Sequence, residues 1–313
     1  MKGFKAFEKG LICRGKQYAE NTVFEEETAE ICKSGMHFCR NPLDVLDYYP
    51  LIDDNGNMSD FAEVEALDET HTDDEKKFCT KKLKIGAKLS LKEFIKASFT
   101  VAYENIKKEV EEATKCIEPG GNRAKLAGGN RAKLAGGAYA TLAGGAYAKL
   151  AGGDDATLAG GDNATLAGGN RAKLAGGAYA KLAGGAYAKL AGGDDAKLAG
   201  GDNATLAGGA YAKLAGGAYA TLAGGAYATL AGGDDATLAG GNRAKLAGGA
   251  GALVVGDHGS VAKGGMGALL VIAERNENGE IVSFGVAIVD GEKIKADTFY
   301  KLENGAFTEG KQQ

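Results

Sequence analysis

The most regular feature of the chain is an eight-residue repeat in which apolar and polar positions alternate. From Gly120 to Ala247, sixteen octads follow one another without a gap, with the consensus Gly-Gly-x-x-Ala-Lys/Thr-Leu-Ala. The fifth and seventh residues are apolar and the sixth is always Lys or Thr, which predicts a strand with one buried face. A helix is disfavoured, because two adjacent glycines in each octad cost about 2 kcal/mol relative to alanine.

A strand of this length cannot bury enough area by itself, so the octads are expected to stack. Each leucine would then rest on the leucines of the neighbouring coils at a spacing of about 4.8 Å. We therefore predict a mainly β fold, in which the repeats form a β-solenoid (parallel β-helix). Two octads per coil are favoured, because alanine at the fifth and eighth positions suits a thin cross-section. Three octads per coil, and either handedness, stay open. The glycine pairs are expected to supply the permissive backbone of the corners.

The repeat divides the chain into three predicted parts. Residues 1–119 are expected to form a small α+β domain that ends in a capping helix. Residues 120–271 form the solenoid, including three looser octads that begin at Gly248, Gly256 and Gly264. Residues 272–313 are expected to form a β-rich C-terminal cap, which stacked coils need for solubility. The same cap is a candidate homodimer surface, because two rod ends that meet would cover each other.

Local patterns predict the elements of the two flanking parts. Strands are expected at 3–7, 17–24, 61–66 and 77–83, and a short helix at 42–49 with Asn41 as its N-cap. Apolar residues at helical spacing from Ser90 to Cys116, with a Ser90–Glu93 capping box, predict a long helix that lies over the first coil. In the cap, 268–273 and 281–289 are predicted strands, and Asp290-Gly291 is a hairpin signal that leads to 293–295.

Composition and charge exclude several classes of protein. Glycine accounts for 51 of 313 residues and proline for 3. Collagen is excluded, because glycine does not occur at every third position. The sequence contains no apolar run of about 18 residues, and its start has no apolar leader, so we expect a cytoplasmic protein with no membrane contact. The five cysteines are expected to be free thiols. The sixteen octads hold 13 basic and 8 acidic residues, whereas residues 1–119 hold 18 and 24, so a mildly basic rod lies between acidic ends.

Reactive side chains in the N-terminal part give little support to catalysis. Cys32, His37 and Cys39 could supply part of a zinc site, with Cys79 or His71 as the fourth ligand, or a Cys–His nucleophile pair. No paired Cys-x2-Cys, orienting third group or oxyanion loop accompanies them. Buried core side chains are the favoured interpretation, so no catalytic residue, metal or cofactor is predicted.

The outward positions of the octads are the favoured candidate for function. The fourth position carries Tyr or Arg in eleven octads, and these side chains are over-represented at binding hot spots. Interleaved aromatic and basic groups could also hold single-stranded nucleic acid, although eight aspartates interrupt a continuous basic stripe. The competing interpretation is structural, namely ladders of stacked Tyr and of Asp against Lys or Arg on neighbouring coils. The candidate binding residues are Arg123, Arg131, Tyr139, Tyr147, Arg171, Tyr179, Tyr187, Tyr211, Tyr219, Tyr227 and Arg243.

Two resemblances accompany this pattern. The octads resemble those of bacterial ice-nucleation proteins, but the Thr-x-Thr rows of that family are replaced by Thr-Leu-Ala or Lys-Leu-Ala. The segments Gly3-Phe4-Lys5-Ala6-Phe7 and Gly35-Met36-His37-Phe38-Cys39, with Asn41-Pro42-Leu43-Asp44, are similar to an uncharacterised domain of phages, prophages and gut bacteria. Its members often carry similar octads and a similar tail, so the resemblance implies a mobile-element accessory protein and brings no catalytic residues.

Together these features lead us to expect a non-enzymatic, rigid binding module of a phage or mobile element. Its Tyr/Arg/Lys surface would bind a host protein or another macromolecule, with nucleic acid less favoured. One alternative places the function in the N-terminal domain, as an enzyme or a small-molecule or metal-binding domain, with the rod as its scaffold. A second alternative is binding of ice or another surface.

Overall fold

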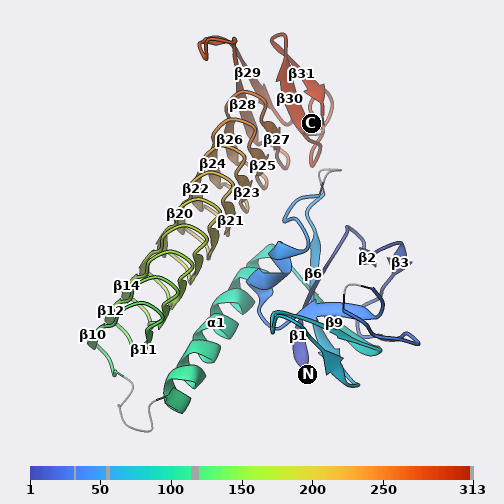
Figure 1. Cartoon of the computed structure of the whole chain (residues 1–313). Helices are drawn as coiled ribbons and strands as arrows, with labels where there is room; N and C mark the ends of the chain where they lie inside the picture. Colours follow the sequence, from blue (N-terminus) through green and yellow to red (C-terminus); the bar gives the residue numbers. More distant parts are fainter. Residues whose placement is uncertain (32, 54–56, 114–119, 311–313) are drawn as a thin grey trace. The chain divides into compact units, whose positions relative to one another are not determined.

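The computed structural model describes all residues except 32, 54–56, 114–119 and 311–313 (Figure 1). The described chain forms two compact units, residues 1–98 and residues 99–313. The predicted division at 119 and 271 stays a prediction, and each unit is described by itself below.

The first unit is built on one antiparallel sheet of seven strands. Their order across the sheet is β4–β9–β6–β1–β5–β8–β7. A small β2–β3 hairpin and a 3₁₀ helix, η1, complete the unit. The bounds are β1 Lys2–Phe7, β2 Ile12–Cys13, β3 Lys16–Gln17, β4 Val23–Glu25, β5 Met36–Cys39, η1 Pro42–Asp47, β6 Asp60–Ala66, β7 Thr70–His71, β8 Lys77–Thr80 and β9 Lys82–Leu89.

The strands predicted at 3–7 and 61–66 are confirmed as β1 and β6, which pair from Lys2↔Glu65 to Phe7↔Asp60. The strands predicted at 17–24 and 77–83 are wrong as single elements. Residues 77–83 divide between β8, which pairs with β5, and β9, which pairs with β6 and β4. Three polar residues, Thr80-Lys81-Lys82, interrupt the apolar pattern at the break, and the sequence-based interpretation wrongly continued one strand across them.

Helix α1, Leu91–Ala113, begins at the predicted capping box. The Glu93 carboxylate accepts hydrogen bonds from the Ser90 backbone N–H and hydroxyl at 2.8 Å, while the Glu93 N–H donates to the Ser90 hydroxyl at 3.3 Å. By contrast, Asn41 makes no side-chain cap hydrogen bond at η1; its amide donates to Asp44 instead. The predicted helical residues 114–116 lie outside the described residues.

The second unit is a parallel β-solenoid of about nine turns between residues 125 and 272. Successive octads alternate between two sheets, which we call the β10 sheet and the β11 sheet. The β10 sheet contains β10 Lys125–Ala127, β12 Thr141–Ala143, β14 Thr157–Ala159, β16 Lys173–Ala175, β18 Lys189–Ala191, β20 Thr205–Ala207, β22 Thr221–Gly224, β24 Thr237–Gly240, β26 Leu253–Gly256 and β28 Leu269–Arg275. The β11 sheet contains β11 Lys133–Ala135, β13 Lys149–Ala151, β15 Thr165–Gly168, β17 Lys181–Gly184, β19 Lys197–Gly200, β21 Lys213–Gly216, β23 Thr229–Ala231, β25 Lys245–Ala247 and β27 Val261–Lys263.

The strand register confirms two octads per coil. Lys125 pairs with Thr141 and Leu126 with Leu142, so equivalent residues of neighbouring coils are 16 positions apart. The fifth-position alanines from Ala140 to Ala252 are fully buried, and the leucines from Leu142 to Leu246 are at most 2% exposed. They form one continuous core between the sheets, as the alternating pattern predicts.

The prediction that the glycine pairs supply the special backbone of the corners is wrong. The glycines of these pairs do not adopt positive φ; the fourth residue does, with φ near 60° at Arg123, Tyr139 and Tyr147. The pairs are needed for close packing instead. A Cβ on Gly152 would lie 2.5 Å from the Ala156 Cβ of the same octad, and one on Gly153 would lie 2.8 Å from the Ala138 backbone nitrogen of the preceding coil.

Helix α1 packs on the first coils of the rod at a different place from the one predicted. Ile106, with Phe99 and Tyr103, packs against Ala135, Ala151 and Ala167. These alanines lie in β11, β13 and β15, so the helix runs across the outer face of three coils rather than over the end of the first coil. Alanine at the eighth position makes this possible, because a longer side chain there would keep the helix away from the strands.

The predicted C-terminal cap is confirmed and closes the core. Strand β29, Ile281–Ile288, pairs antiparallel with β28, and the hairpin of β30, Tyr300–Glu303, and β31, Ala306–Glu309, extends the β11 sheet. Val289, Ile294 and Leu302 are buried against the last leucines. The hairpin predicted at Asp290-Gly291 is wrong: the Asp290 carboxylate accepts hydrogen bonds from the N–H groups of residues 292, 293 and 294 and holds a loop.

Candidate functional site

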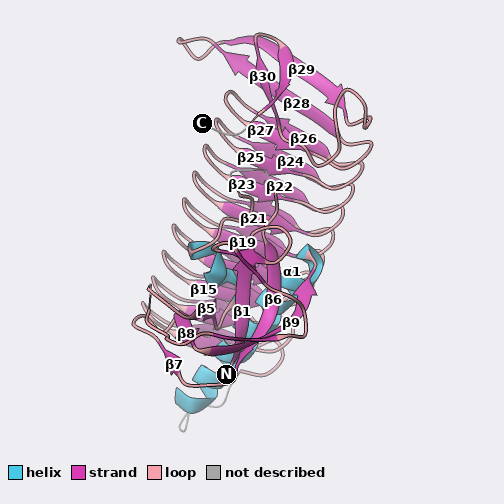
Figure 2. Ribbon diagram, turned by 90° about the vertical axis from the view of Figure 1, so that its right-hand side faces the viewer, coloured by secondary structure: helices cyan, strands magenta, loops and turns pink. Residues whose placement is uncertain are grey.

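The fourth-position residues do not form a single surface. Strands of the two sheets alternate along the chain, so the turns that precede them alternate between the two sides of the rod (Figure 2). We call these sides the Tyr139 edge and the Tyr147 edge. The Tyr139 edge carries Arg123, Tyr139, Arg171, Tyr187 and Tyr219, and the Tyr147 edge carries Arg131, Tyr147, Tyr179, Tyr211, Tyr227 and Arg243.

Each of these residues lies in a β-turn that stacks on the turn of the next coil. The Ala124 N–H donates to the Gly121 carbonyl at 3.3 Å, and the positive φ of Arg123 at the third turn position indicates a type II turn. The Arg123 N–H donates to the Ala138 carbonyl of the next coil at 2.8 Å. A left-handed conformation costs about 1–2 kcal/mol for a residue other than glycine. The stacked backbone hydrogen bonds hold the residue in that conformation and aim its side chain outward.

Several fourth-position side chains form the ladders that the structural interpretation predicts. The guanidinium of Arg123 lies 5.9 Å from the Tyr139 ring centre. Tyr211 and Tyr227 stack with ring centres 4.9 Å apart and planes at 5°, and Arg243 donates a 2.7 Å hydrogen bond to the Tyr227 hydroxyl.

Ion pairing extends these ladders. Arg171 makes a bidentate pair with Asp155 of the preceding coil, at 2.9 and 3.1 Å. The same side chains therefore support one another between coils and remain at the surface.

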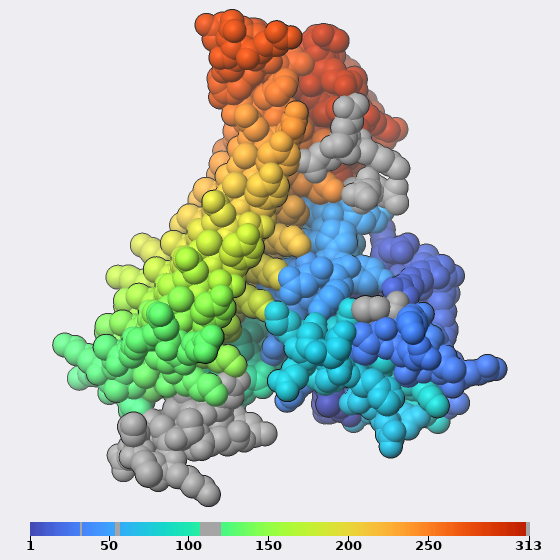
Figure 3. All heavy atoms as spheres, in the orientation of Figure 1, coloured from blue at the N-terminus to red at the C-terminus, as the bar shows by residue number. Residues whose placement is uncertain are grey.

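Three tyrosines stand apart from these ladders. Tyr179, Tyr187 and Tyr219 are 59%, 59% and 61% exposed, and within the described residues their rings make no stacking or cation–π contact. Side chains of the coils project from the rod surface in the green and yellow segment (Figure 3). A rigid turn that presents an unengaged aromatic ring loses little conformational freedom on binding, so both edges carry rings that a partner can contact.

Sequence reasoning missed the role of the third position. Where it is Asn or Asp, its side-chain oxygen accepts a hydrogen bond from the third-position N–H of the next coil: Asn122 from Ala138 at 3.0 Å, and Asp154 from Asn170 at 2.7 Å. These Asn and Asp side chains therefore connect neighbouring coils. The available signal was the restriction of the third position to Asn, Asp and Ala in the sixteen regular octads.

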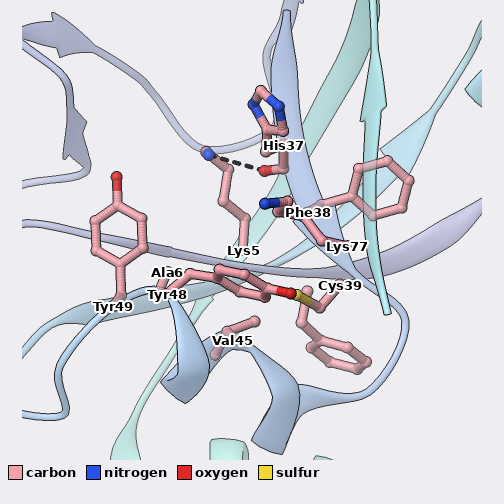
Figure 4. A pocket seen from close by; sticks show the side chains of 10 residues that line it. Lys5, Ala6, His37, Phe38, Cys39, Val45, Tyr48, Tyr49 and Lys77 are labelled. Atoms are coloured by element: carbon pink, nitrogen blue, oxygen red, sulfur yellow. Dashed lines mark hydrogen bonds between the residues drawn. The ribbon is translucent and has the colours of Figure 1, made fainter. Parts of the chain in front are cut away.

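A second candidate site lies in the first unit, and sequence reasoning missed it. A cavity of about 790 Å³ is bordered by the β2–β3 hairpin, by β5 and by the segment that follows η1. A smaller pocket of about 40 Å³ shares part of its lining (Figure 4). The residues that line both are Lys5, His37, Tyr48, Tyr49 and Lys77.

Burial governs the ionisation of the groups around this cavity. Lys5 is 4% exposed, and its ammonium donates to the His37 carbonyl at 2.8 Å (Figure 4). Desolvation lowers its pKa below the ordinary lysine value, and neighbouring Cys13 opposes this shift. Burial also lowers the pKa of His37 and raises that of the Cys39 thiol to about 12. Cys39 is therefore a neutral thiol at physiological pH, which weighs against its use as a nucleophile.

The metal-ligand hypothesis gains no support from the described residues. His37 and His71 both pair in register with Cys79 on neighbouring strands, but no group of three or more His, Cys, Asp or Glu side chains in the described part of the chain is arranged to hold a metal. Cys32 lies outside the described residues. Cys13, Cys39 and Cys79 are free thiols, as predicted; Cys116 also lies outside the described part.

Comparisons with known proteins identify the first unit only as an uncharacterised module. A family model described as a domain of unknown function (DUF7666) matches residues 1–97. The curated proteins and the solved structures contain no match to the chain. Within the described residues, no helix is both long enough and apolar enough to cross a membrane. The matched domain ends one residue before the boundary of the first compact unit, and it contains the whole 790 Å³ cavity.

Proposed function

We propose that the protein is a non-enzymatic binding module whose rod presents the Tyr147 edge to a host protein. The observation that carries this proposal is a row of tyrosines and arginines fixed on rigid, stacked turns. Tyr and Arg are enriched at binding hot spots, and Tyr buries a large area at a small cost in conformational entropy. The backbone of each turn is already ordered by hydrogen bonds to the next coil.

The Tyr147 edge is favoured over the Tyr139 edge by its composition. It carries four tyrosines and two arginines at the fourth position, and Asp195 is the one acidic residue in that column. The Tyr139 edge carries three tyrosines, and Asp155 pairs there with Arg171. A protein partner is favoured over nucleic acid, because the basic groups are too sparse to follow a phosphate backbone.

Surface binding through threonine rows is not proposed. The outward sixth position of the β10 sheet carries exposed Thr141 and Thr157, but Lys173 and Lys189 then interrupt the row. A long charged side chain at each interruption prevents a flat lattice of hydroxyl groups.

The two edges provide matched controls for an experiment. Full-length protein would be used to capture partners from bacterial lysate, alongside a Tyr179→Ala/Tyr211→Ala variant of the Tyr147 edge and a Tyr187→Ala/Tyr219→Ala variant of the Tyr139 edge. We expect a partner retained by the wild type and the second variant to be lost from the first. A partner that both variants retain would contradict the proposal and place the function elsewhere.

We also propose an origin in a phage or mobile element and a site of action inside the bacterial cell. The segments at 3–7 and 35–44 support this origin through their resemblance to the uncharacterised domain described above. The free thiols of Cys13, Cys39 and Cys79 are compatible with a reducing compartment. Fractionation of infected or lysogenic cells tests the localisation, and recovery of the protein only from the medium would contradict it.

Finally, we propose that two copies pair through the C-terminal cap. The outer face of the last three strands of the β10 sheet is apolar: Leu253, Val255, Leu269 and Val271 occupy positions that hold Lys, Thr or Ala in the regular octads. Register places Val286 beside Val271 and Ile288 beside Leu269, so β29 continues this face. Its exposed members are Ile281 (56%), Val282 (61%), Phe284 (68%), Val286 (55%) and Ile288 (60%).

The area of this face supports a second copy as its occupant. With about 150–200 Å² per large apolar side chain, the five exposed residues leave roughly 500 Å² in water, which is at the upper end for a monomer. Two such flat faces would bury about 1,000 Å² or more, which is enough for a specific dimer. β29 is also the edge strand of its sheet and its sequence contains no charged residue, so nothing in it opposes self-association.

Light scattering coupled to size exclusion tests the pairing. Wild-type protein is expected to elute as a dimer and a Phe284→Lys/Val286→Lys variant as a monomer with an unchanged circular dichroism spectrum. Thr221→Lys/Thr237→Lys, on the polar part of the same sheet, should stay dimeric. A monomeric wild type would contradict the dimer but leave the proposed function of the Tyr147 edge standing.

A further inference from the structure

The cavity of the first unit is large and strongly cationic. Its volume of about 790 Å³ falls within the range of small-molecule sites. Five basic side chains line it, together with His37, whereas Glu26 and Asp47 are its acidic residues. Two of the five cations are paired, Lys16 with Glu26 at 3.1 Å and Lys33 with Glu30 at 3.2 Å, which leaves three cations and Asp47 in the charge balance. The cavity therefore retains an excess of positive charge.

Lys5 is buried in this wall without a carboxylate partner. Its contacts in the described structure are the His37 carbonyl, the Cys13 side chain and the faces of the Phe7 and Tyr18 rings, at 5.4 and 6.0 Å from the ring centres. A buried ammonium is normally compensated by an anion, because removal from water is costly. The missing counter-charge can be supplied from the cavity that Lys5 lines.

Two further cations border the same space. Arg14 lies in the two-residue turn of the β2–β3 hairpin, where it and Gly15 both have positive φ, which fixes the hairpin tip. Its guanidinium makes no hydrogen bond or ion pair to the described residues. The Lys77 ammonium lies 4.5 Å from the centre of the Tyr48 ring. A planar guanidinium and two ammonium groups are the side chains that recognise phosphate.

We propose that this cavity binds a phosphate-bearing small molecule of about the size of a nucleotide, with Lys5, Arg14 and Lys77 around its phosphate groups. The volume exceeds what phosphate alone would fill, so an organic part is required. Tyr18, Tyr48 and Tyr49 line the remaining wall, and their rings can pack against a base or sugar. The Tyr49 hydroxyl lies 2.8 Å from the Cys13 sulfur, which holds this ring in place.

Bound phosphate would also raise the pKa of Lys5. An anion beside the ammonium favours its charged form, so the pKa that burial lowers would rise on binding. This proposal goes beyond the binding function of the rod, and it concerns residues 5–77, all within the domain that the family model matches.

Isothermal titration of the full-length protein tests the proposal with ATP, AMP, inorganic pyrophosphate and adenosine as probes. ATP and AMP are expected to bind, pyrophosphate more weakly and adenosine not measurably. Arg14→Gln and Lys77→Gln should each weaken nucleotide binding about tenfold or more, since each removes a charge-assisted contact. Lys9→Gln removes an exposed cation that does not line the cavity, so it should leave the affinity unchanged.

Melting curves of the unliganded variants verify that each is folded, and Arg14 is exposed, so its replacement should not disturb the core. The proposal is overturned if none of the phosphate compounds binds at millimolar concentration. It is also overturned if adenosine binds as tightly as AMP, or if Lys9→Gln weakens binding as much as Arg14→Gln. Loss of partner capture by the Tyr147-edge variant with nucleotide binding intact would show that the two proposals stand independently.

Discussion

At the scale of single residues, the octad divides its roles in a way that residue type alone does not indicate. The left-handed position is occupied by Tyr, Arg, Asp or Asn in every regular octad, and by Gly251, Gly259 and Gly267 in the looser ones. The glycines of the pairs do not adopt positive φ, and they lack a side chain because neighbouring atoms are close. The sequence analysis correctly predicted that the glycine pairs are required, but it attributed this to backbone freedom. The structure attributes it to close packing.

The packing role of the glycines predicts unequal losses of stability for the same substitution at two second-position glycines. Gly193→Ala places a Cβ 2.8 Å from the Ala178 backbone nitrogen, which cannot move without displacing a coil. We expect a loss of about 2 kcal/mol or more in unfolding free energy. Gly121→Ala, at the second position of the first coil, meets nothing within 4 Å and should be nearly silent. Urea unfolding followed by circular dichroism distinguishes them; equal effects would contradict the packing argument.

The left-handed backbone of the fourth position gives a second residue-level prediction. Tyr219→Asn relieves part of the conformational cost without loss of a ring contact, so the rod should gain about 0.5–1 kcal/mol. Tyr227→Asn relieves the same conformational cost of the backbone, but it loses the stack on Tyr211 and the hydrogen bond from Arg243. It should be about 1 kcal/mol less stable than Tyr219→Asn in the same urea assay. The reverse order would show that the ladders contribute nothing.

At the scale of elements, alternation predicted every strand of the rod but not the strand partners of the first unit. In the rod, each octad repeats the same local environment, so one correct assignment of faces extends to all coils. In the first unit, residues 77–83 leave one partner strand for another at Lys81, and the polar run Thr80-Lys81-Lys82 does not show which strand pairs next. The position of α1 was also missed, because eighth-position alanines such as Ala151 resemble ordinary surface residues in the sequence.

The assignment of faces predicts unequal effects of two adjacent substitutions in β18. Leu190 is 2% exposed, so Leu190→Asp would bury an unpaired carboxylate between the sheets and should cost about 3 kcal/mol or more. Lys189 is exposed, and other octads have Thr there, so Lys189→Thr should change stability by less than about 0.5 kcal/mol. Limited proteolysis within residues 180–200 provides the measurement. Similar cleavage of both variants would mean that the faces are reversed.

At the scale of the whole molecule, the chain joins an uncharacterised domain with a cavity to a rod whose surface changes along its length. The regular coils expose Tyr, Arg, Lys and Thr, and strand β29 of the cap exposes Ile, Val and Phe. The sequence predicted the rod and its cap, because a strict repeat constrains every coil. The cavity could not be predicted, since Lys5, Arg14 and Lys77 come from three separate segments whose approach depends on the sheet order.

The coil of two octads is the central claim, and one distance tests it directly. Spin labels on non-natural side chains that replace Thr141 and Thr237 would lie on the same face of the β10 sheet, six strand pairings apart. At about 4.8 Å per coil, double electron–electron resonance should give a separation of about 29 Å. A coil of three octads would place the same positions four coils apart, and a measured separation near 19 Å would contradict the account.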